Sequence, residues 1–211
     1  MGNTDPYRVI ARFYDRVLEP VNAPLRSVAA RMTQPQPEWV VLDVGCGTGA
    51  ALADYQAMGC HVIGVDTSNA MITLARERLG GDARLHNDPS EQLPVDDDSV
   101  DLVHFGLMLH SVSPDTGFRL LREAGRVIHG RGRVVVIDFA AGAVDFPRGW
   151  GNRAASVVAE VAAGPTHARH SLAYHRRGGL APLAGRAGLS IERSKIVGGG
   201  NMMVSVLIAD R

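Results

Sequence analysis

The sequence has little cysteine and no excess of charge of either sign. Only two of its 211 residues are cysteines, too few for a disulfide framework or for a zinc cluster. Lysine and arginine number 22 and are balanced by 22 aspartates and glutamates, so the formal net charge is zero. A nucleic-acid partner normally requires a basic excess, and we therefore predict no nucleic-acid partner.

Long apolar runs are also missing. No stretch of about 18 apolar residues occurs, so we predict no integral membrane span. The first residues, MGNTDPYRV, lack the basic and apolar regions of a secretory signal, and we expect a cytoplasmic protein. The composition, 45% hydrophobic and 21% charged, is typical of a globular chain, and the length fits one domain covering 1–211.

From Trp39 onward, short apolar runs alternate with helical segments. The apolar runs cover 39–44, 61–66, 83–86, 99–105 and 132–139. The helical segments between them cover 50–58, 68–79 and 114–128. This alternation predicts parallel βαβ units, and the apolar strands are typical of a sheet buried on both faces.

The two ends of the chain depart from this alternation. Residues 1–37 have helical spacing, which we expect Pro20 and Pro24 to interrupt. Helices are also expected over 150–162 and 176–187, and a run of three glycines between two β-rich segments predicts a hairpin. We therefore predict an α/β fold with a doubly wound, mostly parallel, seven-stranded sheet and an antiparallel C-terminal hairpin.

The most specific local motif is VLDVGCGTG at 41–49, where a strand enters a glycine-rich turn before a helix. Glycines allow a tight turn and close approach of a ligand, and the helix N-terminus offers free N–H groups to a carboxylate or phosphate. Gly45, Gly47 and Ala50 also satisfy the loose glycine pattern of dinucleotide binders. Asp43 is the discriminating residue, because its carboxylate would repel a pyrophosphate but attract an ammonium group. A turn that binds nothing is the alternative.

Asp66 ends the second apolar run, about 20 residues after the first glycine, where a carboxylate accepts hydrogen bonds from ribose hydroxyls. The alternative is that Asp66 only caps the following helix. Asp43, the glycine turn and Asp66 together suit a ligand with an amino group, a carboxylate and a ribose. S-adenosylmethionine has all three.

Four motifs, in order, resemble those of the class I S-adenosylmethionine-dependent methyltransferases. The resemblance is strongest to the small-molecule group that includes the ubiquinone/menaquinone and phospholipid-headgroup enzymes, and it covers about residues 5–140. The motifs are VLDVGCGTG, VIGVD, LPVDDDSVDLVHFGLMLH at 93–110 and REAGRVIHGRGRVVVID at 122–138. The resemblance implies methyl transfer to a small acceptor, lipophilic or anionic, with S-adenosylhomocysteine as product.

The resemblance also assigns cofactor-binding residues. Those expected around the methionine part and the ribose are Asp43, Gly45, Cys46, Gly47, Gly49, Asp66 and the backbone at Phe105. Those expected around the adenine are Thr67, Met71, Asp88 and Ser90. Ser90 is included because Pro89, which follows Asp88, has no N–H to donate to the ring. For Met71 the alternative is a core residue at helical spacing.

Two residues are candidates for a role in catalysis. Tyr14 resembles a residue of an N-terminal helix that folds over the cofactor, and its hydroxyl could reach the methionine carboxylate. The alternative is that Tyr14 and Tyr7 form the packed face of this helix. His110 follows the fourth strand at the ligand-binding edge and is the candidate base or acceptor contact. The alternative is a histidine that only packs there, and His104, in mid-strand, is read as structural.

Segments 1–37 and 140–187 are expected to form lids on the cofactor and acceptor sides. Six arginines and one acid lie between Phe146 and Arg186, which suits an anionic acceptor or, alternatively, a solvated basic loop. The pair His167 and His170 lacks a nearby carboxylate or cysteine, so we expect no metal.

Three other functions are alternatives to small-molecule methyl transfer. A nicotinamide-dependent dehydrogenase shares the glycine turn and Asp66, but Asp43 and the missing second Rossmann half count against it. A DNA or RNA amino-methyltransferase should have an Asn/Asp-Pro-Pro-aromatic motif after the fourth strand, where this chain has FGLM. A non-catalytic S-adenosylmethionine-binding module remains an alternative, because the displacement requires no obligatory catalytic residue.

Overall fold

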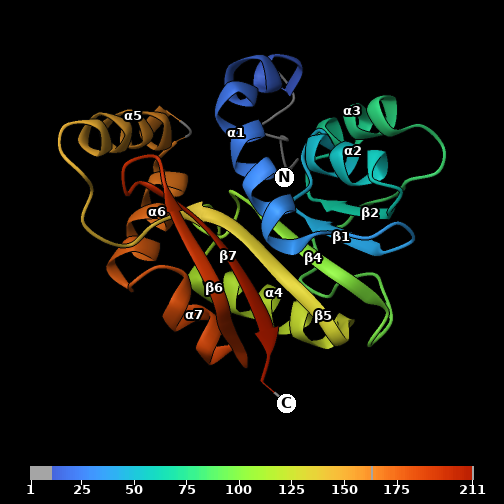
Figure 1. Cartoon of the computed structure of the whole chain (residues 1–211). Coiled ribbons are helices and arrows are strands. Elements are labelled where there is room, and N and C mark those ends of the chain that lie inside the picture. The colour runs from blue at the N-terminus through green and yellow to red at the C-terminus, as the bar shows by residue number, and fades with distance from the viewer. Residues whose placement is uncertain (1–10, 163, 211) are drawn as a thin grey trace.

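The computed structural model describes residues 11–162 and 164–210, which form one seven-stranded sheet flanked by helices (Figure 1). The strands are β1 Val40–Val44, β2 His61–Asp66, β3 Arg84–Asn87, β4 Val100–Gly106, β5 Ile128–Phe139, β6 Leu189–Val197 and β7 Met202–Ala209. Their order is β3-β2-β1-β4-β5-β7-β6. The five strands β1 to β5 are parallel to one another, whereas β7 is antiparallel to both β5 and β6. The predicted sheet is therefore confirmed.

Helices cover both faces of this sheet. They are α1 Ala11–Thr33, α2 Ala50–Ala57, α3 Asn69–Leu79, α4 Pro114–Val127, α5 Arg148–Ala162, α6 Pro165–Arg176 and α7 Leu180–Arg186. In Figure 1, α1, α2 and α3 lie above the sheet, and α4 and α7 lie below it. Burial on both faces explains why the central strands are almost continuously apolar, with Leu42 and Val103 fully buried.

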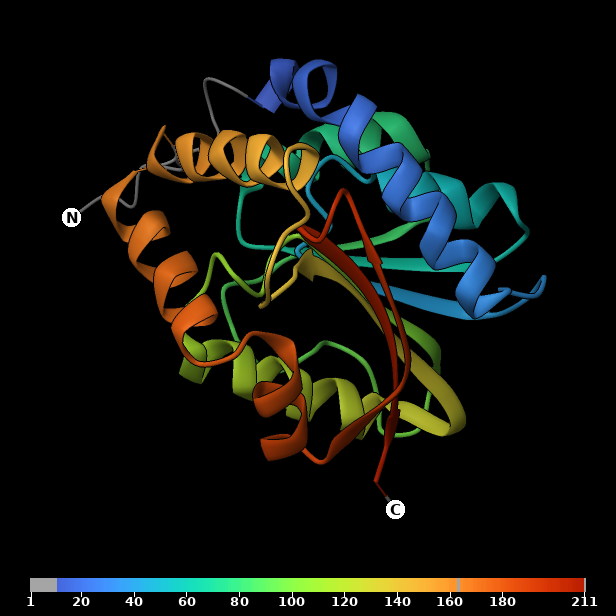
Figure 2. The same ribbon diagram turned by 60° about the vertical axis from the view of Figure 1, so that its left-hand side comes forward.

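Helix α1 corrects one expectation, because it continues through Pro20 and Pro24 instead of ending there. Each proline removes a backbone donor, and the helix bends rather than breaks (Figure 2). After the prolines, Leu25 and Ala29 are buried against the sheet. Arg26 also bonds to Glu19, which joins the turns on either side of Pro20. Tertiary contacts therefore compensate for the lost helical hydrogen bonds.

The segment after β5 contains a second correction. Helix α5 agrees with the helix expected over 150–162, but the one expected over 176–187 is only partly confirmed, because α7 covers just Leu180–Arg186. Instead, α6 ends at Arg176, and Gly178 and Gly179 adopt positive φ angles of 88° and 70° before α7 begins. Such angles favour glycine and end a helix.

The hairpin is closed by Gly198, Gly199 and Gly200, all with positive φ, and Val197 pairs with Met202 beside the turn. The carbonyl of Gly199 accepts a hydrogen bond from Asp145 N, which fixes the turn against the loop after β5. Among the described residues, no helix combines the length and apolarity needed to cross a membrane.

Candidate functional site

The glycine turn connects the carboxyl end of β1 to α2. Gly45, Gly47 and Gly49 have φ angles of 75°, 53° and 77°, which an L side chain rarely adopts. Gly45 N and Cys46 N both donate to the carbonyl of Val65, at 2.8 and 3.1 Å. The turn is therefore fastened to the end of the neighbouring strand β2.

Asp66 completes this connection with its side chain. One carboxylate oxygen accepts from Gly47 N and the other from Ser68 N, both at 2.8 Å. The N-cap of α3 is Ser68, whose hydroxyl accepts from Met71 N at 3.2 Å. The alternative role of Asp66 as the cap of that helix is therefore wrong, and its carboxylate is held in a fixed orientation at the strand end.

A cavity opens beside Asp66. It lies at the carboxyl ends of β1, β2 and β4, where ligands bind in open α/β sheets. The residues that sequence reasoning had selected and that line it are Gly45, Gly47, Asp66, Thr67, Met71, Asp88 and Ser90. Met71 lines the cavity although its side chain is almost completely buried, so it serves the core as well.

Ser90 has its donors committed within its own loop. Its backbone N–H donates to Asp88 at 2.7 Å, and its hydroxyl donates to the carbonyl of Gln92 at 3.0 Å. A hydrogen bond from Ser90 N to an adenine would compete with the bond to Asp88. The structure therefore weakens the case for Ser90, and Asp88 is the better candidate for contact with a base.

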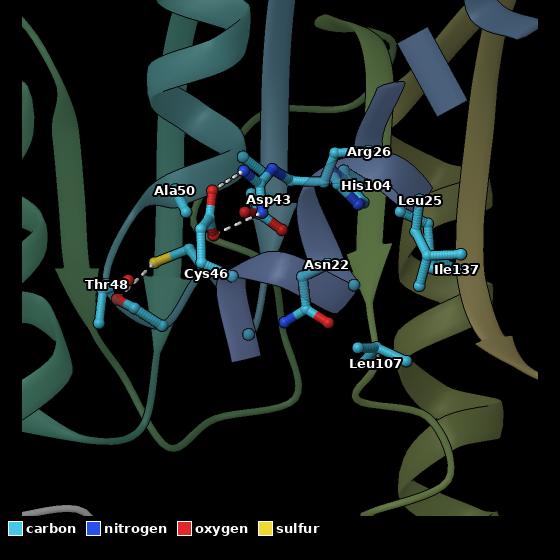
Figure 3. A pocket seen from close by; sticks show the side chains of 15 residues that line it. Asn22, Leu25, Arg26, Asp43, Cys46, Thr48, Ala50, His104, Leu107 and Ile137 are labelled. Atoms are coloured by element: carbon cyan, nitrogen blue, oxygen red, sulfur yellow. Dashed lines mark hydrogen bonds and ion pairs between the residues drawn. The ribbon is translucent and has the colours of Figure 1, made fainter. Parts of the chain in front are cut away.

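A second cavity adjoins the first, and the two share Gly45, Gly47, Gly106 and Leu107 in their linings. Figure 3 shows this second cavity, with side chains from α1, β1, the glycine turn and β4. Cys46 and Asp43 contribute to it from the predicted set. Together the two cavities form a continuous cleft across the glycine turn, which we call the turn cleft.

The carboxyl of Asp43 is buried in the turn cleft. Burial, and then the nearby charge of Asp66, raise the pKa of Asp43 to about 8, while Arg26 acts in the opposite direction. On the adjacent strand β4, His104 is the register partner of Asp43. Burial lowers the pKa of His104 to about 3, and the charge of Arg26 lowers it further. At neutral pH both side chains are therefore mostly uncharged.

Sequence analysis expected the N-terminal helix near the cofactor but missed the residues that α1 contributes to this cleft. Arg26 lines it together with Glu19. Arg26 bonds to Glu19 at 2.6 Å and to Asp54 of α2 at 2.7 Å, and the ion pairs raise its pKa despite partial burial. The only available signal was the spacing of seven residues between Glu19 and Arg26, which places both on one helix face.

His110 follows the carboxyl end of β4 and does not line the turn cleft. Its Nδ1 is 2.7 Å from Oδ1 of Asp138, and its backbone N–H donates to Oδ2 at 3.2 Å. Both residues are buried. The ring of His167, from α6, lies 5.5 Å from that of His110. Asp138 was missed because only the pairing of β4 with β5 brings the ends of these strands together.

Other predicted residues are placed apart from the cleft. Phe105 is fully buried, although the next residue, Gly106, lines both cavities. Gly49 faces α3, where a Cβ would lie 3.0 Å from Leu79. Tyr14 lies within α1, but its side chain, like the whole of Tyr7, is outside the described residues.

The arginines and histidines of the segment after β5 do not gather at one site. Arg153 donates to the carbonyls of Ala140 and Gly142, and Arg186 lies over the ring of Phe118. Arg169 and Arg176 are exposed. Of the two histidines, His170 contacts the carbonyl of Ser111, and no metal-binding group of three His, Cys, Asp or Glu side chains occurs in the described part of the chain.

Comparison with known proteins agrees with this geometry. Residues 42–136 match a family model described as a methyltransferase domain. Demethylmenaquinone methyltransferase of Clavibacter sepedonicus is 36% identical over 127 residues, which cover 58% of this chain and 50% of the relative. Malonyl-[acyl-carrier protein] O-methyltransferase of Yersinia pestis is 33% identical over 115 residues, covering 54% and 42%. The chain thus spans about half the length of the curated relatives it matches.

A similar fold occurs in the crystal structure of Burkholderia thailandensis 1,6-didemethyltoxoflavin-N1-methyltransferase, which holds 1,6-didemethyltoxoflavin and S-adenosylhomocysteine. Its TM-score is 0.65 at 17% identity, with 98% of this chain and 87% of that one covered. Residues 42–136 therefore resemble a methyltransferase domain, the matching relatives include demethylmenaquinone methyltransferases, and the fold is shared with S-adenosylmethionine-dependent methyltransferases.

Proposed function

We propose that this protein transfers a methyl group from S-adenosylmethionine to a small acceptor of lipophilic or anionic character. The observation that supports this most directly is the fixed carboxylate of Asp66 at the edge of the turn cleft. Both of its oxygens are oriented by backbone donors, Gly47 N and Ser68 N. A carboxylate held in this way at the end of β2 suits the two hydroxyls of a ribose.

The proposed placement of the cofactor follows from the two cavities. The cavity beside Asp66 takes the adenosine, with Asp66 on the ribose, Thr67 and Met71 beside the adenine and Asp88 on its amino group. The second cavity takes the methionine part, against the glycine turn and near Asp43. The shared residues Gly45 and Gly47 lie where the sulfur would connect the two parts.

Methyl transfer is an in-line displacement. The bond from sulfur to the methyl carbon breaks as the bond to the acceptor forms, and the sulfur keeps the electron pair as a thioether. Positioning provides much of the catalysis, and a base is needed only when the acceptor must lose a proton. We propose that His110 takes that proton, because its neighbours Met108 and Ser111 line the turn cleft.

The contact with Asp138 supports this role for His110. A carboxylate at 2.7 Å from Nδ1 favours the tautomer with the proton on Nδ1, so Nε2 is the basic nitrogen. The acceptor would then be a hydroxyl or an acidic carbon rather than a neutral amine that loses its proton after the transfer. A protein that only binds the cofactor would have no use for a base at this position.

The first test is calorimetric titration with S-adenosylhomocysteine. Asp66→Ala should weaken binding by more than about 1 kcal/mol, because hydrogen bonds to a charged acceptor are lost. Asp82→Ala is the matched control, since Asp82 is an exposed carboxylate just after α3. Equal affinity of the Asp66→Ala variant and the wild type would exclude the ribose role.

The second part of the test follows the methyl group. Methyl-labelled S-adenosylmethionine is incubated with the protein and a small-molecule extract of the source cells, and the products are separated into lipid and aqueous fractions. Label in the lipid fraction that is lost with Asp66→Ala would indicate a lipophilic acceptor, and aqueous label a polar one. No transfer above that variant in either fraction would contradict the proposed activity.

A further inference from the structure

His104 is an unusual residue for the interior of a parallel sheet. It lies in the middle of β4 with only 1% of its surface exposed. Neither Nδ1 nor Nε2 has a hydrogen-bond partner among the described residues. Buried polar atoms are nearly always hydrogen-bonded, because leaving one unpaired costs stability. A core position with this geometry would favour an apolar side chain, so the imidazole calls for another explanation.

The surroundings of His104 show which part of its ring lies next to the turn cleft. The ring lies edge to face with that of Tyr55, at 5.7 Å between centroids, so α2 covers one side. Two residues further along the same face of β4 is Gly106, where a Cβ would lie 3.3 Å from Nε2 of His104. Both ring nitrogens are buried, but His104 and Gly106 line the turn cleft, so no side chain at position 106 stands between Nε2 and a ligand that fills the cleft.

The charges around the ring determine what it can bind. The groups facing it are Asp43 from β1, Arg26 and Glu19 from α1, and the Tyr55 ring from α2. Arg26 is already paired with Glu19 and Asp54. With a pKa lowered to about 3, the imidazole is neutral and has one nitrogen that accepts a hydrogen bond. An acceptor nitrogen beside the Asp43 carboxyl suits a cationic donor.

We propose that His104 binds the α-ammonium group of the cofactor, accepting a hydrogen bond at Nε2 while the carboxylate of Asp43 neutralises the charge. This inference rests on the proposed function and assigns a binding role to a residue that its position in the strand had suggested to be structural. It also explains the glycine at 106, because a side chain there would separate the imidazole from the ligand.

The test compares two ligands that differ only at this end. S-adenosylhomocysteine carries the amino-acid group, whereas 5′-methylthioadenosine has the same adenosine and sulfur without it. His104→Leu should lower affinity for S-adenosylhomocysteine about tenfold, the value of one hydrogen bond to a charged group. Affinity for 5′-methylthioadenosine should change less than about twofold, because the lost interaction is absent from that complex.

Two further variants separate binding from packing. Leu102→Val removes volume from the same face of β4 and should leave the ratio of the two affinities unchanged. His104→Gln can place its amide oxygen near the position of Nε2, whereas His104→Asn is too short, so Gln should preserve the ratio better than Asn. This comparison decides the question even if the leucine variant does not fold.

The outcomes separate the two proposals. Equal losses for both ligands in His104→Leu, or no loss for either, would overturn the role of His104 and leave a histidine that only packs or binds water. Wild-type protein that binds neither ligand would instead contradict the proposed function itself.

Discussion

At the scale of single residues, Asp43 is subject to two opposing requirements. Its carboxyl is buried beside the neutral ring of His104, and burial favours the protonated form. An approaching ammonium group would favour the ionised form instead. A residue that only had to stabilise the fold would be apolar here, as Leu42 and Val44 are on either side. The carboxyl is therefore best explained by a ligand.

Burial of the Asp43 carboxyl should make the free energy of unfolding depend on pH. The pKa of Asp43 is about 8 in the folded chain, above the value of about 4 expected when it is unfolded. Between these values the unfolded chain has released a proton that the folded chain retains, so wild-type stability falls as pH rises. Asp43→Asn removes this term and should gain up to about 1.4 kcal/mol per pH unit relative to wild type.

Urea unfolding of both proteins at pH 5, 6.5 and 8 measures this difference. Asp66, Arg26 and Glu19 lie near Asp43 and are unchanged in the variant, so their own titration cancels to first order. A difference in unfolding free energy that stays constant with pH would mean that Asp43 is ionised in the folded protein throughout.

At the scale of elements, the contact between His110 and Asp138 joins the loop after β4 to the end of β5. We expect His110→Gln to lower kcat by about a hundredfold or more, the contribution typical of a general base. Binding of S-adenosylhomocysteine should be unaffected. Asp138→Asn should also lower kcat, because residue 138 then no longer fixes the tautomer of His110. The pH at which the rate falls on the acidic side should shift as well.

The fold supplies a matched control for this experiment. His129 and Asp101 form a second histidine–carboxylate contact, also at 2.7 Å, at the opposite end of β4 and β5. His129→Gln should leave kcat and its pH profile as in the wild type. Loss of activity in both histidine variants alike would assign the effect to stability instead of proton transfer.

Elements with strong local signals were predictable from sequence, and those decided by distant contacts were not. The glycine turn and the helices expected over 68–79 and 114–128 follow from neighbouring residues, and the helices agree with α3 and α4. The passage of α1 through two prolines depends on burial of Leu25 against the sheet, which no local pattern reveals. Arg26 and Asp138 were missed for the same reason, because strand order and helix packing place them.

At the scale of the whole molecule, the turn cleft lies between the sheet and α1, which belongs to one of the two segments expected to be lids. Helix α1 contributes Glu19, Leu25 and Arg26 to the cleft. Helix α5 exposes a row of apolar side chains at helical spacing, made up of Trp150, Val157, Val158 and Val161. Such a surface is consistent with a segment that contacts another apolar group.

Hydrogen exchange would test whether α1 acts as a lid on the cofactor. Saturating S-adenosylhomocysteine should slow amide exchange in 19–33 of α1 and in the turn and helix over 45–57, because bound ligand suppresses local opening. The hairpin over 189–209 should not change and serves as an internal reference. Protection in the glycine turn without any in α1 would show that the helix does not close over the ligand.

The order of the strands has a further consequence, for biosynthesis. Strand β7 is the last strand in the sequence, yet it lies between β5 and β6, and six of its eight residues are buried. While the ribosome is still adding these residues, β5 has an unpaired apolar edge and β6 has no neighbour through which to join the sheet. This half of the molecule therefore assembles only after synthesis has passed Ala209, and until then its open edge is a target for chaperones or for aggregation.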